Sequence, residues 1–445
     1  MDTTLILGMM LWADTAAPPR TRWGVAVQSD RIVDAGPNEE LRARFSDSPV
    51  VDATDCVITP SFVNAHHHTY GVLSHGIPLD LAPGSAQSST GLWPFLEAFW
   101  WPRIEDRLTH EMIAAATDWA CLEMVRSGVT TFYDCLEAPH ALPGALDVQA
   151  EIVRGWGLRG VLSFEATERV TKENGQLGLR ENARFIDDCQ AEDGLVSGMM
   201  CIHTTFTCSA DFIRRAFELA AERDARVHMH LSEGTYEPEY ALSHFGLRPA
   251  LYYDRLGVLG PHVLASQCVQ VDQEEIKVLA ERGVHVAHQP ISNCEVGGGF
   301  APVPEMLDAG VNVALGTDGY VNNLFDVMRS AALLPKARLL DPSTMPAATA
   351  WTMATHNGAR ALGFRDLGRL EPGNLADLLL IRGHLPTPLK PTNAADQLLL
   401  WRNPIHLRGV MCAGQWLMED GEVLGVDEEG LRTRTAEAAA QLWGT

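Results

Sequence analysis

The sequence predicts an α/β protein built from a (β/α)₈ TIM barrel and a small β-sandwich-like domain. Stretches typical of strands and helices alternate through eight units over roughly 300 residues in the middle of the chain. Both ends of the chain carry only short strand-like stretches and turns until a final helical segment. Polar side chains suited to metal or proton chemistry follow several central strands, where barrel enzymes hold their active sites.

The two ends of the chain are expected to build one domain together. Strand-like stretches lie at residues 5–11, 23–28, 31–34 and 50–59, and they return at 378–381 and within 407–418. An alanine-rich amphipathic helix is expected at 428–443. We therefore expect a composite β domain from residues 1–59 and 370–445, and a barrel from residues 60–369.

The middle of the chain alternates as a barrel requires. After the strand that leads to His66, strands are expected at residues 129–134, 159–164, 198–204, 227–231, 262–268, 284–288 and 311–315. Helices are expected at residues 111–127, 145–156, 181–190, 211–223 and around 249–256. Another begins at Asp272, which has the capping-box spacing with Glu275. A doubly wound open sheet is the alternative, but no Gly-x-Gly-x-x-Gly turn opens these helices, which favours the barrel.

Composition excludes several classes of protein. No apolar run reaches the roughly 18 residues of a membrane span, and residues 5–12 lack the basic flank of a signal peptide. A formal net charge of -23 argues against nucleic-acid or anionic-membrane partners. Nine scattered cysteines without a Cys-x-x-Cys pair fit the reduced thiols of a cytoplasmic enzyme.

The segment from Pro60 to His68 supplies the first candidate metal ligands. Side chains alternate in an extended segment, so His66 and His68 point to one side and His67 to the other. Two imidazoles on one face can hold a transition metal ion, although a polar loop with three histidines would look the same.

Other strand ends carry residues of the same chemical kind. His203 ends the fourth expected strand, His230 the fifth, and Asp318 follows the eighth. Three histidines and one carboxylate with an open coordination position make a catalytic metal site, because the open position is left for water.

These motifs resemble the amidohydrolase superfamily, in the branch of S-adenosylhomocysteine deaminase, guanine deaminase and the triazine hydrolases. The matching motifs are Asn64-Ala65-His66-x-His68, Ser127-Gly128-Val129-Thr130-Thr131, His230-Leu231-Ser232-Glu233, His288-Gln289-Pro290-Ile291-Ser292-Asn293, Leu315-Gly316-Thr317-Asp318-Gly319 and Glu371-Pro372-Gly373-Asn374-Leu375-Ala376-Asp377-Leu378. Through Trp100-Trp101 and residues 164–169 the chain is more weakly similar to the SsnA-type aminohydrolases.

The resemblance implies a role for each matching residue. One divalent metal ion, with Zn²⁺ expected and Fe²⁺ as the alternative, would be bound by His66, His68, His230 and Asp318. Glu233 would shuttle protons beside the substrate, and His203 would contact the substrate. Binuclear members of the superfamily use a carboxylated lysine at the end of the fourth strand, and none of the lysines of this chain falls there. One ion is therefore expected.

Gln267 departs from the family pattern. It stands at the end of the sixth strand, where the family usually has a histidine near the attacking water. The glutamine amide can donate a hydrogen bond but cannot carry a proton, so we expect metal binding to survive while rate and specificity change. Gln267 is therefore a candidate catalytic and substrate-binding residue.

Three further substrate contacts are expected, each with a structural alternative. Trp93 belongs to an aromatic run that would cover a flat heterocycle or else pack helices or a dimer contact. Arg169 would meet an acidic substrate group or form a surface ion pair. Asn322, just past Asp318, would line the pocket or cap the next helix.

Together these features predict a metal-dependent aminohydrolase acting on a purine, pterin, triazine or similar small heterocycle. Metal-activated water would add to the ring carbon while Asp318 takes the water proton and Glu233 protonates the ring nitrogen, before ammonia leaves. The alternatives are a dechlorinase or amide hydrolase with the same site, and a ligand-binding barrel without turnover, suggested by Gln267. A small-molecule substrate, a cytoplasmic location and a homodimer or larger homo-oligomer are also expected.

Overall fold

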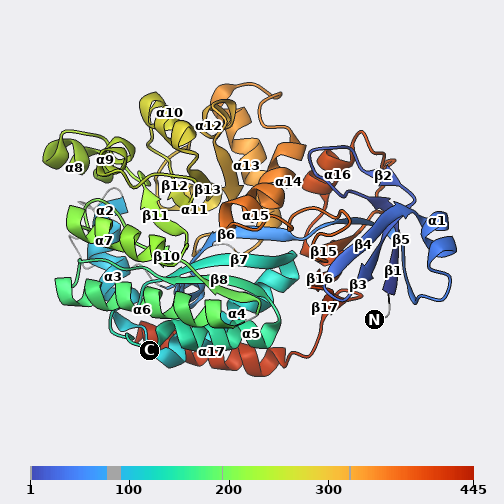
Figure 1. The fold of residues 1–445 in the computed structure, drawn as a ribbon, viewed down its shortest axis with the longest axis horizontal. Helices are drawn as coiled ribbons and strands as arrows, with labels where there is room; N and C mark the ends of the chain where they lie inside the picture. The colour runs from blue at the N-terminus through green and yellow to red at the C-terminus, as the bar shows by residue number, and fades with distance from the viewer. Residues whose placement is uncertain (1–2, 78–91, 193, 320–321, 445) are drawn as a thin grey trace.

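A computed structural model describes residues 3–77, 92–192, 194–319 and 322–444 of the chain. Figure 1 shows the barrel and its helices filling the left of the view and a β-rich domain standing to the right. The expected fold class is confirmed.

Parallel strands form the barrel, and two isolated bridges complete its circuit. The strands are β6 (Phe62–His67), β7 (Val129–Leu136), β8 (Arg159–Phe164), β9 (Val196–Gly198), β10 (Met200–Cys201), β11 (Val227–Leu231), β12 (Val263–Gln267), β13 (His285–His288) and β14 (Asn312–Leu315). They pair as β6-β7-β8-β9 and β10-β11-β12-β13-β14. Parallel bridges Ala166↔Ile202 and His67↔Asp318 join the two sheets. With β9 and β10 taken as one interrupted strand, the described chain holds the eight strand positions that the sequence predicts.

Helices cover the outside of the barrel (Figure 1). They are η1 (Thr69–Ser74), α2 (Leu92–Phe95), η2 (Leu96–Trp100), α3 (Trp101–Arg103), η3 (Glu105–Arg107), α4 (His110–Ser127), α5 (Ala145–Trp156), α6 (Lys172–Ala191), α7 (Ala210–Ala221), α8 (Tyr236–Phe245), α9 (Pro249–Leu256), α10 (Gln273–Arg282), α11 (Pro290–Glu295), α12 (Val303–Asp308), α13 (Leu324–Leu339), α14 (Ala347–Ala354) and α15 (His356–Leu362). The capping box expected at Asp272 is confirmed at the start of α10.

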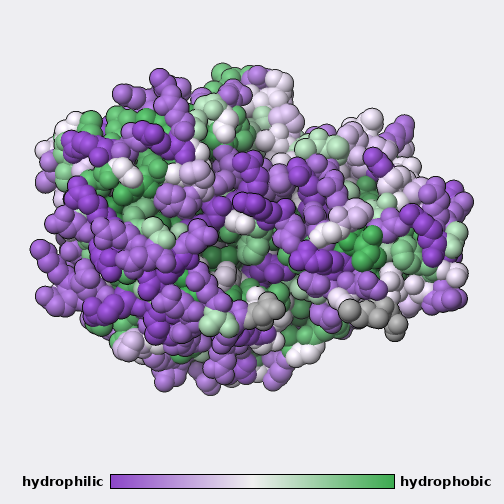
Figure 2. Space-filling model, in the orientation of Figure 1, coloured by the Kyte–Doolittle hydropathy of each residue, from purple (hydrophilic) through white to green (hydrophobic). Residues whose placement is uncertain are grey.

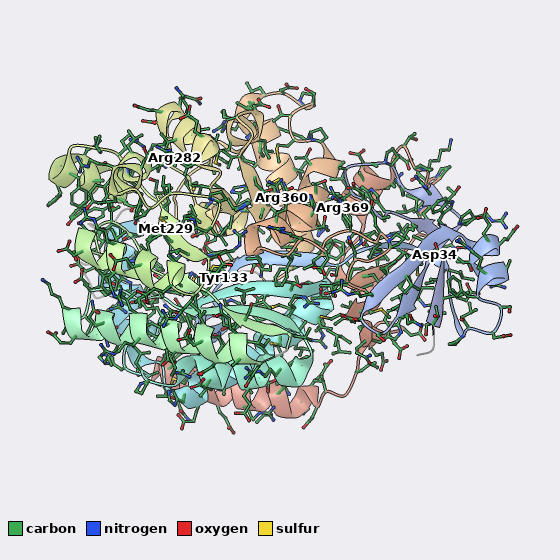
Figure 3. All side chains as sticks on the ribbon, in the orientation of Figure 1. Asp34, Tyr133, Met229, Arg282, Arg360 and Arg369 are labelled. Atoms are coloured by element: carbon green, nitrogen blue, oxygen red, sulfur yellow. The ribbon has the colours of Figure 1, made fainter. Side chains whose placement is uncertain are left out.

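The barrel strands are buried on both faces. Tyr133 and Cys135 belong to the cluster inside the barrel, whereas Phe132 and Met229 pack in the larger cluster beneath the helices. Figure 3 labels Tyr133 and Met229 on neighbouring parts of the barrel and Asp34 in the β domain. Burial on both faces explains why these strands read as continuous apolar runs in the sequence.

Strands from both chain ends share one sheet, as expected. Its elements are β1 (Thr3–Leu11), β2 (Arg20–Thr21), β3 (Trp23–Gln28), β4 (Arg31–Pro37), β5 (Val50–Pro60), β15 (Leu378–Arg382), β16 (Leu407–Cys412), β17 (Gln415–Glu419) and β18 (Glu422–Val423). β5 pairs with β1 on one side and β15 on the other, in the order β18-β17-β16-β15-β5-β1-β3-β4, with β2 beside β1. Because β5 runs on into β6, the sheet anchors the strand that carries the first histidines. α1 (Asn38–Arg44) packs beside β3 and β4.

The C-terminal helices lie against the barrel. α16 (Ala394–Trp401) contacts α14, η4 (Pro404–His406) precedes β16, and α17 (Glu428–Trp443) contacts α4. Arg434 of α17 pairs with Asp118 of α4 at 3.1 Å, and Trp443 Nε1 donates to the Leu73 carbonyl at 2.7 Å. The expected domain boundaries, residues 1–59 plus 370–445 for the β domain and residues 60–369 for the barrel, stay a prediction.

α6 begins nine residues earlier than the helix expected at residues 181–190, at Lys172. Thr171 caps it by accepting a hydrogen bond from the Asn174 N–H at 3.1 Å. Gly175 and Gly178 obscured this half of the helix because glycine is a poor helix former. A Cβ at Gly178 would lie 3.0 Å from side-chain atoms of Ala166 and Phe164, so the glycine allows close helix–strand packing.

The surface matches the strongly acidic composition. Figure 2 shows hydrophilic side chains over most of the visible face, with smaller apolar patches between them. Among the described residues, no helix is both long and apolar enough to cross a membrane.

Candidate active site

Three histidines converge inside the barrel at the C-terminal ends of its strands. His66 lies in β6, His68 directly follows it, and His230 lies in β11. Each offers a ring nitrogen within 4.8 Å of those of the other two. The ring centroids lie 4.9 Å apart for His66 and His68, and 5.0 Å apart for His66 and His230. The alternation expected for β6 therefore brings both imidazoles to one point.

Asp318, three residues past the end of β14, lies beside this group. Its Oδ1 lies 3.7 Å from His68 Nε2, and its Oδ2 lies 3.9 Å from His66 Nε2. The segment before it is fastened to β6, because Asn64 Nδ2 donates to Thr317 Oγ1 at 2.6 Å and the Thr317 N–H donates to Asn64 Oδ1 at 3.1 Å. His67 faces the other way, with Nδ1 2.6 Å from the Asp318 carbonyl. This is the direction that the alternation of side chains predicts for His67.

The donor chemistry of the three histidines fits a divalent cation. His68 Nδ1 lies 2.8 Å from the Cys135 carbonyl, and an N–H directed there leaves the Nε2 lone pair free for a metal. His66 Nε2 is buried without a hydrogen-bond partner among the described residues. Burial lowers the pKa of His66 and of His230 well below the ordinary range, and neighbouring histidines lower it further. The rings are therefore neutral at physiological pH, as metal ligation requires.

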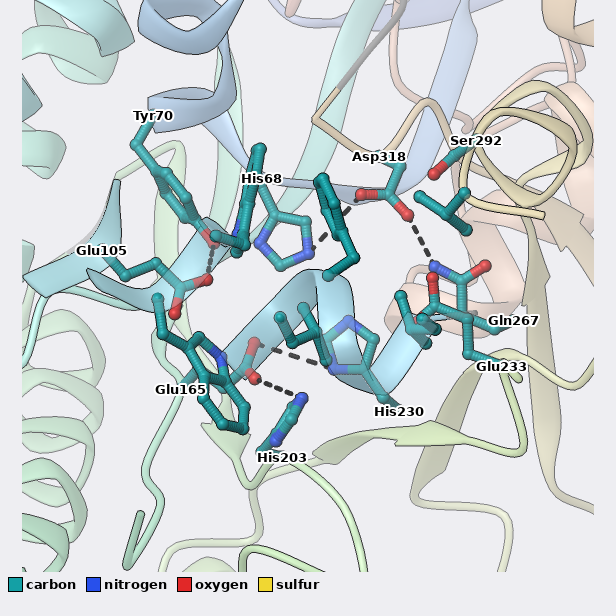
Figure 4. A pocket seen from close by; sticks show the side chains of 16 residues that line it. His68, Tyr70, Glu105, Glu165, His203, His230, Glu233, Gln267, Ser292 and Asp318 are labelled. Carbon is teal, nitrogen blue, oxygen red and sulfur yellow. Dashed lines mark hydrogen bonds and ion pairs between the residues drawn. The ribbon is translucent and has the colours of Figure 1, made fainter. Parts of the chain in front are cut away.

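A pocket opens above these residues at the C-terminal ends of the barrel strands. Figure 4 shows the polar side chains on its wall. They are His68, Tyr70, Glu105, Glu165, His203, His230, Glu233, Gln267, Ser292 and Asp318. Apolar and aromatic side chains, among them Phe95, Trp100 and Trp101, line the rest.

Glu233 lines the same pocket as His68, His230 and Asp318, two residues past the end of β11. Burial raises the pKa of its carboxyl well above the usual range, and the charges of Asp318 and Glu237 add to the effect. Glu237 fastens the turn, since its carboxylate accepts hydrogen bonds from the Ser232 N–H at 2.6 Å and the Thr205 N–H at 3.0 Å. Burial thus favours the protonated form of Glu233, which is the form that a proton donor beside the pocket needs.

Gln267 is joined directly to Asp318. Its Nε2 donates to Asp318 Oδ2 at 2.6 Å, and its backbone N–H donates to Gln289 Oε1 at 3.0 Å. Both Gln267 and Asp318 have left-handed backbones, with φ of 73° and 60°, and Ser232 before Glu233 has φ of 51°. Such strained positions gather at functional sites, where the surrounding structure holds them in place.

His203 lies on the opposite side of His230 from Asp318 (Figure 4). Its Nδ1 lies 2.9 Å from Thr207 Oγ1, and its Nε2 lies 3.5 Å from Glu165 Oε1. Burial, with a contribution from Arg169, lowers the pKa of His203 to about 3, so the ring is neutral. A neutral imidazole on the pocket wall can exchange hydrogen bonds with a substrate.

Three expected substrate contacts are directed elsewhere. Arg169 is already paired with Glu105 at 3.1 Å and Asp106 at 2.9 Å, and it also contacts Glu137. Trp93 stacks on Tyr236 with ring centroids 4.4 Å apart and lines a neighbouring groove. Asn322 donates a hydrogen bond to Glu123. The structure thus brings none of the three side chains to the wall of the central pocket, among the residues it describes.

Two residues at the site were missed in the sequence. Cys135, in β7, has its Sγ 3.6 Å from His68 Nδ1 and groups with the three histidines as a possible ligand. Glu165, one residue past β8, lies 3.7 Å from His230 Nδ1. Their positions at the ends of the second and third barrel strands were the available signal. His228 lies deeper inside the barrel, where its Nδ1 is 3.3 Å from Cys201 Sγ.

The fold and the grouping of these side chains agree with the class of protein that the comparison shows: the chain belongs to the amidohydrolase family, whose model matches residues 57–417. It is 36% identical over 442 residues to a 5-methylthioadenosine/S-adenosylhomocysteine deaminase of Syntrophobacter fumaroxidans, covering 97% of each chain. It is 34% identical to a 5'-deoxyadenosine deaminase of Methanothermobacter thermautotrophicus, covering 95% of each.

Solved structures show the same fold. An adenosine deaminase of Xanthomonas campestris with bound zinc superposes with a TM-score of 0.88 at 28% identity, covering 99% of both chains. A zinc-complexed atrazine chlorohydrolase of Arthrobacter aurescens has a TM-score of 0.83 at 23% identity, covering 98% of this chain and 100% of the other. The family, the fold class and the carbon–nitrogen hydrolase class expected from the sequence are confirmed.

Proposed function

We propose that this protein is a zinc-dependent aminohydrolase that removes the exocyclic amine of an adenine nucleoside. The observation that carries this proposal is the convergence of His66, His68 and His230, with Asp318 beside the first two and Glu233, whose raised pKa favours the protonated form, on the same pocket wall. The named activities of the deaminase relatives support the nucleoside as substrate.

The ligand set proposed for the metal is His66, His68, His230 and Asp318, with Fe²⁺ as the alternative to Zn²⁺. A bound divalent ion supplies Lewis acidity that makes water a usable nucleophile near neutral pH. Zinc in the solved adenosine deaminase relative supports zinc here. Cys135 is a competing ligand by position, but burial raises the pKa of its thiol well above the usual range, which favours the carboxylate.

Asp318 and Glu233 divide the proton transfers between them. Asp318 accepts the proton of the attacking water, while its carboxylate is held in place by the Gln267 amide and by the Gly319 N–H, which donates at 2.7 Å. Glu233 donates a proton to the ring nitrogen next to the attacked carbon, because that nitrogen becomes basic as its double bond is lost. Asp318 then passes the water proton to the amine, which leaves as ammonia.

Gln267 takes a positioning role in this scheme. Its amide cannot shuttle a proton, and its Nε2–H already points at Asp318 Oδ2. His203 is proposed to contact the substrate from the opposite wall. The proposal also includes a cytoplasmic location, which the nine free thiols support, and a homodimer or larger homo-oligomer, which stays a prediction.

Ammonia release from zinc-loaded protein tests the proposal. The substrates are 5'-deoxyadenosine, methylthioadenosine, S-adenosylhomocysteine, guanine, a pterin and an aminotriazine, with Glu233→Gln as the matched inactive control. We expect turnover of the adenine nucleosides and little of the triazine. Chloride release from a chlorotriazine without deamination would instead make the protein a dechlorinase. No turnover at full zinc occupancy would overturn the enzyme proposal in favour of a binding barrel.

A further inference from the structure

An exposed apolar surface covers three neighbouring elements on the outside of the barrel, α13, α16 and η4. Twelve large hydrophobic side chains are exposed among the described residues, and half of them lie on these elements or directly beside them. These six residues, which we call the α13–α16 surface, are Leu333, Leu339, Leu340, Leu400, Trp401 and Ile405. Exposed apolar side chains gathered in this way mark interaction sites more often than scattered ones do.

Hydrogen bonds and helix geometry make this surface continuous. Arg329 of α13 donates two hydrogen bonds to Asn403 Oδ1, each at 2.8 Å, so the segment from Trp401 to Ile405 lies against α13. Leu333 lies one helical turn beyond Arg329 on the same side of the helix. Figure 1 shows α13, α14 and α16 packed side by side. The apolar residues of α13 therefore adjoin those of α16 and η4.

Leu340 has a backbone conformation that its side chain does not favour. It caps the C-terminal end of α13 with a left-handed φ of 55°, and its side chain is 90% exposed. Glycine is the usual residue at such a position, because a Cβ is disfavoured there. Leu340 also lies two helical turns beyond Leu333, on the same side. A strained and exposed leucine adds little to the stability of one chain, whereas an apolar partner surface would bury it.

The charge of this surface differs from that of the rest of the molecule. The chain contains 57 aspartate and glutamate residues, yet residues 327–340 and 397–408 contain none. Two copies of a chain with a formal net charge of -23 repel each other. They therefore associate most readily through a face that is poor in carboxylates.

The cations of these two segments are already engaged within the chain. Arg329 pairs with Asp326 at 2.7 Å, and Lys336 Nζ donates to the Pro342 carbonyl at 2.8 Å. Carboxylates or backbone carbonyls likewise engage the other three, which are Arg338, Arg402 and Arg408. A nucleic acid or an anionic membrane, which binds free cations, fits this surface poorly. An apolar partner surface poor in charge fits it.

We propose that the α13–α16 surface is the contact through which two copies of this chain form a dimer. A twofold contact brings the same surface of both copies together, so an apolar surface serves as its own partner. Trp401, which is 64% exposed, is of the residue type most enriched among the strong contacts of such interfaces. This inference names a surface for the homo-oligomer proposed for this protein, and it does not depend on the deaminase activity.

Sedimentation velocity of the full chain over a concentration series tests the proposal. Trp401→Glu and Ile405→Glu each place a carboxylate in the surface, so that a dimer would bury two of them. Leu242→Glu is the matched control, because Leu242 is a 47% exposed leucine of α8, outside the surface. A melting temperature measured at a monomeric dilution shows whether each variant is folded.

We expect the native protein to sediment as a dimer. Trp401→Glu and Ile405→Glu should each raise the dimer dissociation constant at least about tenfold at an unchanged melting temperature of the monomer. Leu242→Glu should leave that constant unchanged. Added salt should strengthen the native dimer, because it screens the repulsion between two acidic copies.

Leu340→Gly separates a contact between copies from a role inside one chain. Glycine adopts the left-handed conformation without strain, so the melting temperature of the monomer should not fall, while the dimer dissociation constant should rise. A native monomer at every concentration would overturn the proposal. Equal dimer affinity in the native protein and in both glutamate variants of the surface would also overturn it. Equal weakening by Leu242→Glu, or weakening of the native dimer by salt, would place the contact elsewhere and reject this surface.

Discussion

Replacing Gln267 by leucine tests a residue at which the resemblance to the family predicts a histidine instead. The native amide donates to Asp318 Oδ2 at 2.6 Å, and both residues are buried. Leucine keeps much of the volume but leaves that carboxylate oxygen without its donor. Gln267→His keeps a ring N–H that can reach the same oxygen. The two variants therefore separate the loss of a hydrogen bond from a change of side chain.

The expected magnitude follows from the hydrogen bond itself. A hydrogen bond to a charged group contributes about 1.5–3 kcal/mol. At about 1.36 kcal/mol per tenfold in rate, Gln267→Leu should turn over about 10- to 150-fold more slowly. Gln267→His should keep much of the activity, and both variants should keep the metal.

The assay is ammonia release under single-substrate saturation, with metal content measured on the same samples. Gln273→Leu is the matched control, because it removes an amide from the exposed first residue of α10. Normal turnover of Gln267→Leu would refute the positioning role and leave the residue as packing. Activity appearing only in Gln267→His would place the native protein with non-catalytic barrels.

Three further predictions follow from the site. Elemental analysis should find about one divalent metal ion per native chain. Substituting alanine for any one proposed ligand, His66, His68, His230 or Asp318, should lower this metal content. Glu233→Gln should slow turnover about 10²–10⁴-fold while keeping the metal. Because the pKa of the Glu233 carboxyl is raised, kcat of the native protein should fall as pH rises through that pKa. The pH profile of kcat in the variant should lack this fall. Burial raises the pKa of Asp134 to about 6 from an ordinary 3.8. The protonated Asp134 carboxyl therefore stabilises the folded state fully below about pH 4, and this contribution is lost as pH rises through 6. In denaturant titrations, the unfolding free energy of the native protein relative to Asp134→Asn should drop by about 3 kcal/mol from pH 4 to 8.

Each of these has an outcome that contradicts it. Two ions per native chain would reject the single-metal site, and the group of Glu165, His203 and His230 would then be the place to look for the second. Full activity of Glu233→Gln would remove that residue from the mechanism. A pH-independent difference between native protein and Asp134→Asn would show that Asp134 is ionised throughout.

Local sequence patterns were enough to predict most of the fold. Strand β6 and helices α5, α9 and α17 lie where periodicity and turn residues indicated, because their burial repeats match one secondary structure. The N-terminal half of α6 was missed because it contains two glycines, and the close packing of Gly178 against Phe164 of β8 and Ala166 cannot be read from the helix sequence itself. The β-rich character of both chain ends could be predicted from the sequence. The pairing of β15 with β5 could not, because it joins residues more than 300 positions apart.

For the site, the sequence by itself determined which chemical groups are present and at which strand ends. His66, His68, His230, Glu233 and Asp318 were identified because motif spacing and strand alternation are local properties. Only the tertiary structure decided what each group faces. It directs Gln267 to Asp318, engages Arg169 with three carboxylates and leaves Glu165 facing the pocket. The reason is that a side chain's partner depends on which distant strands the closed barrel brings together, and a hydrogen bond or an ion pair forms only over a few ångströms.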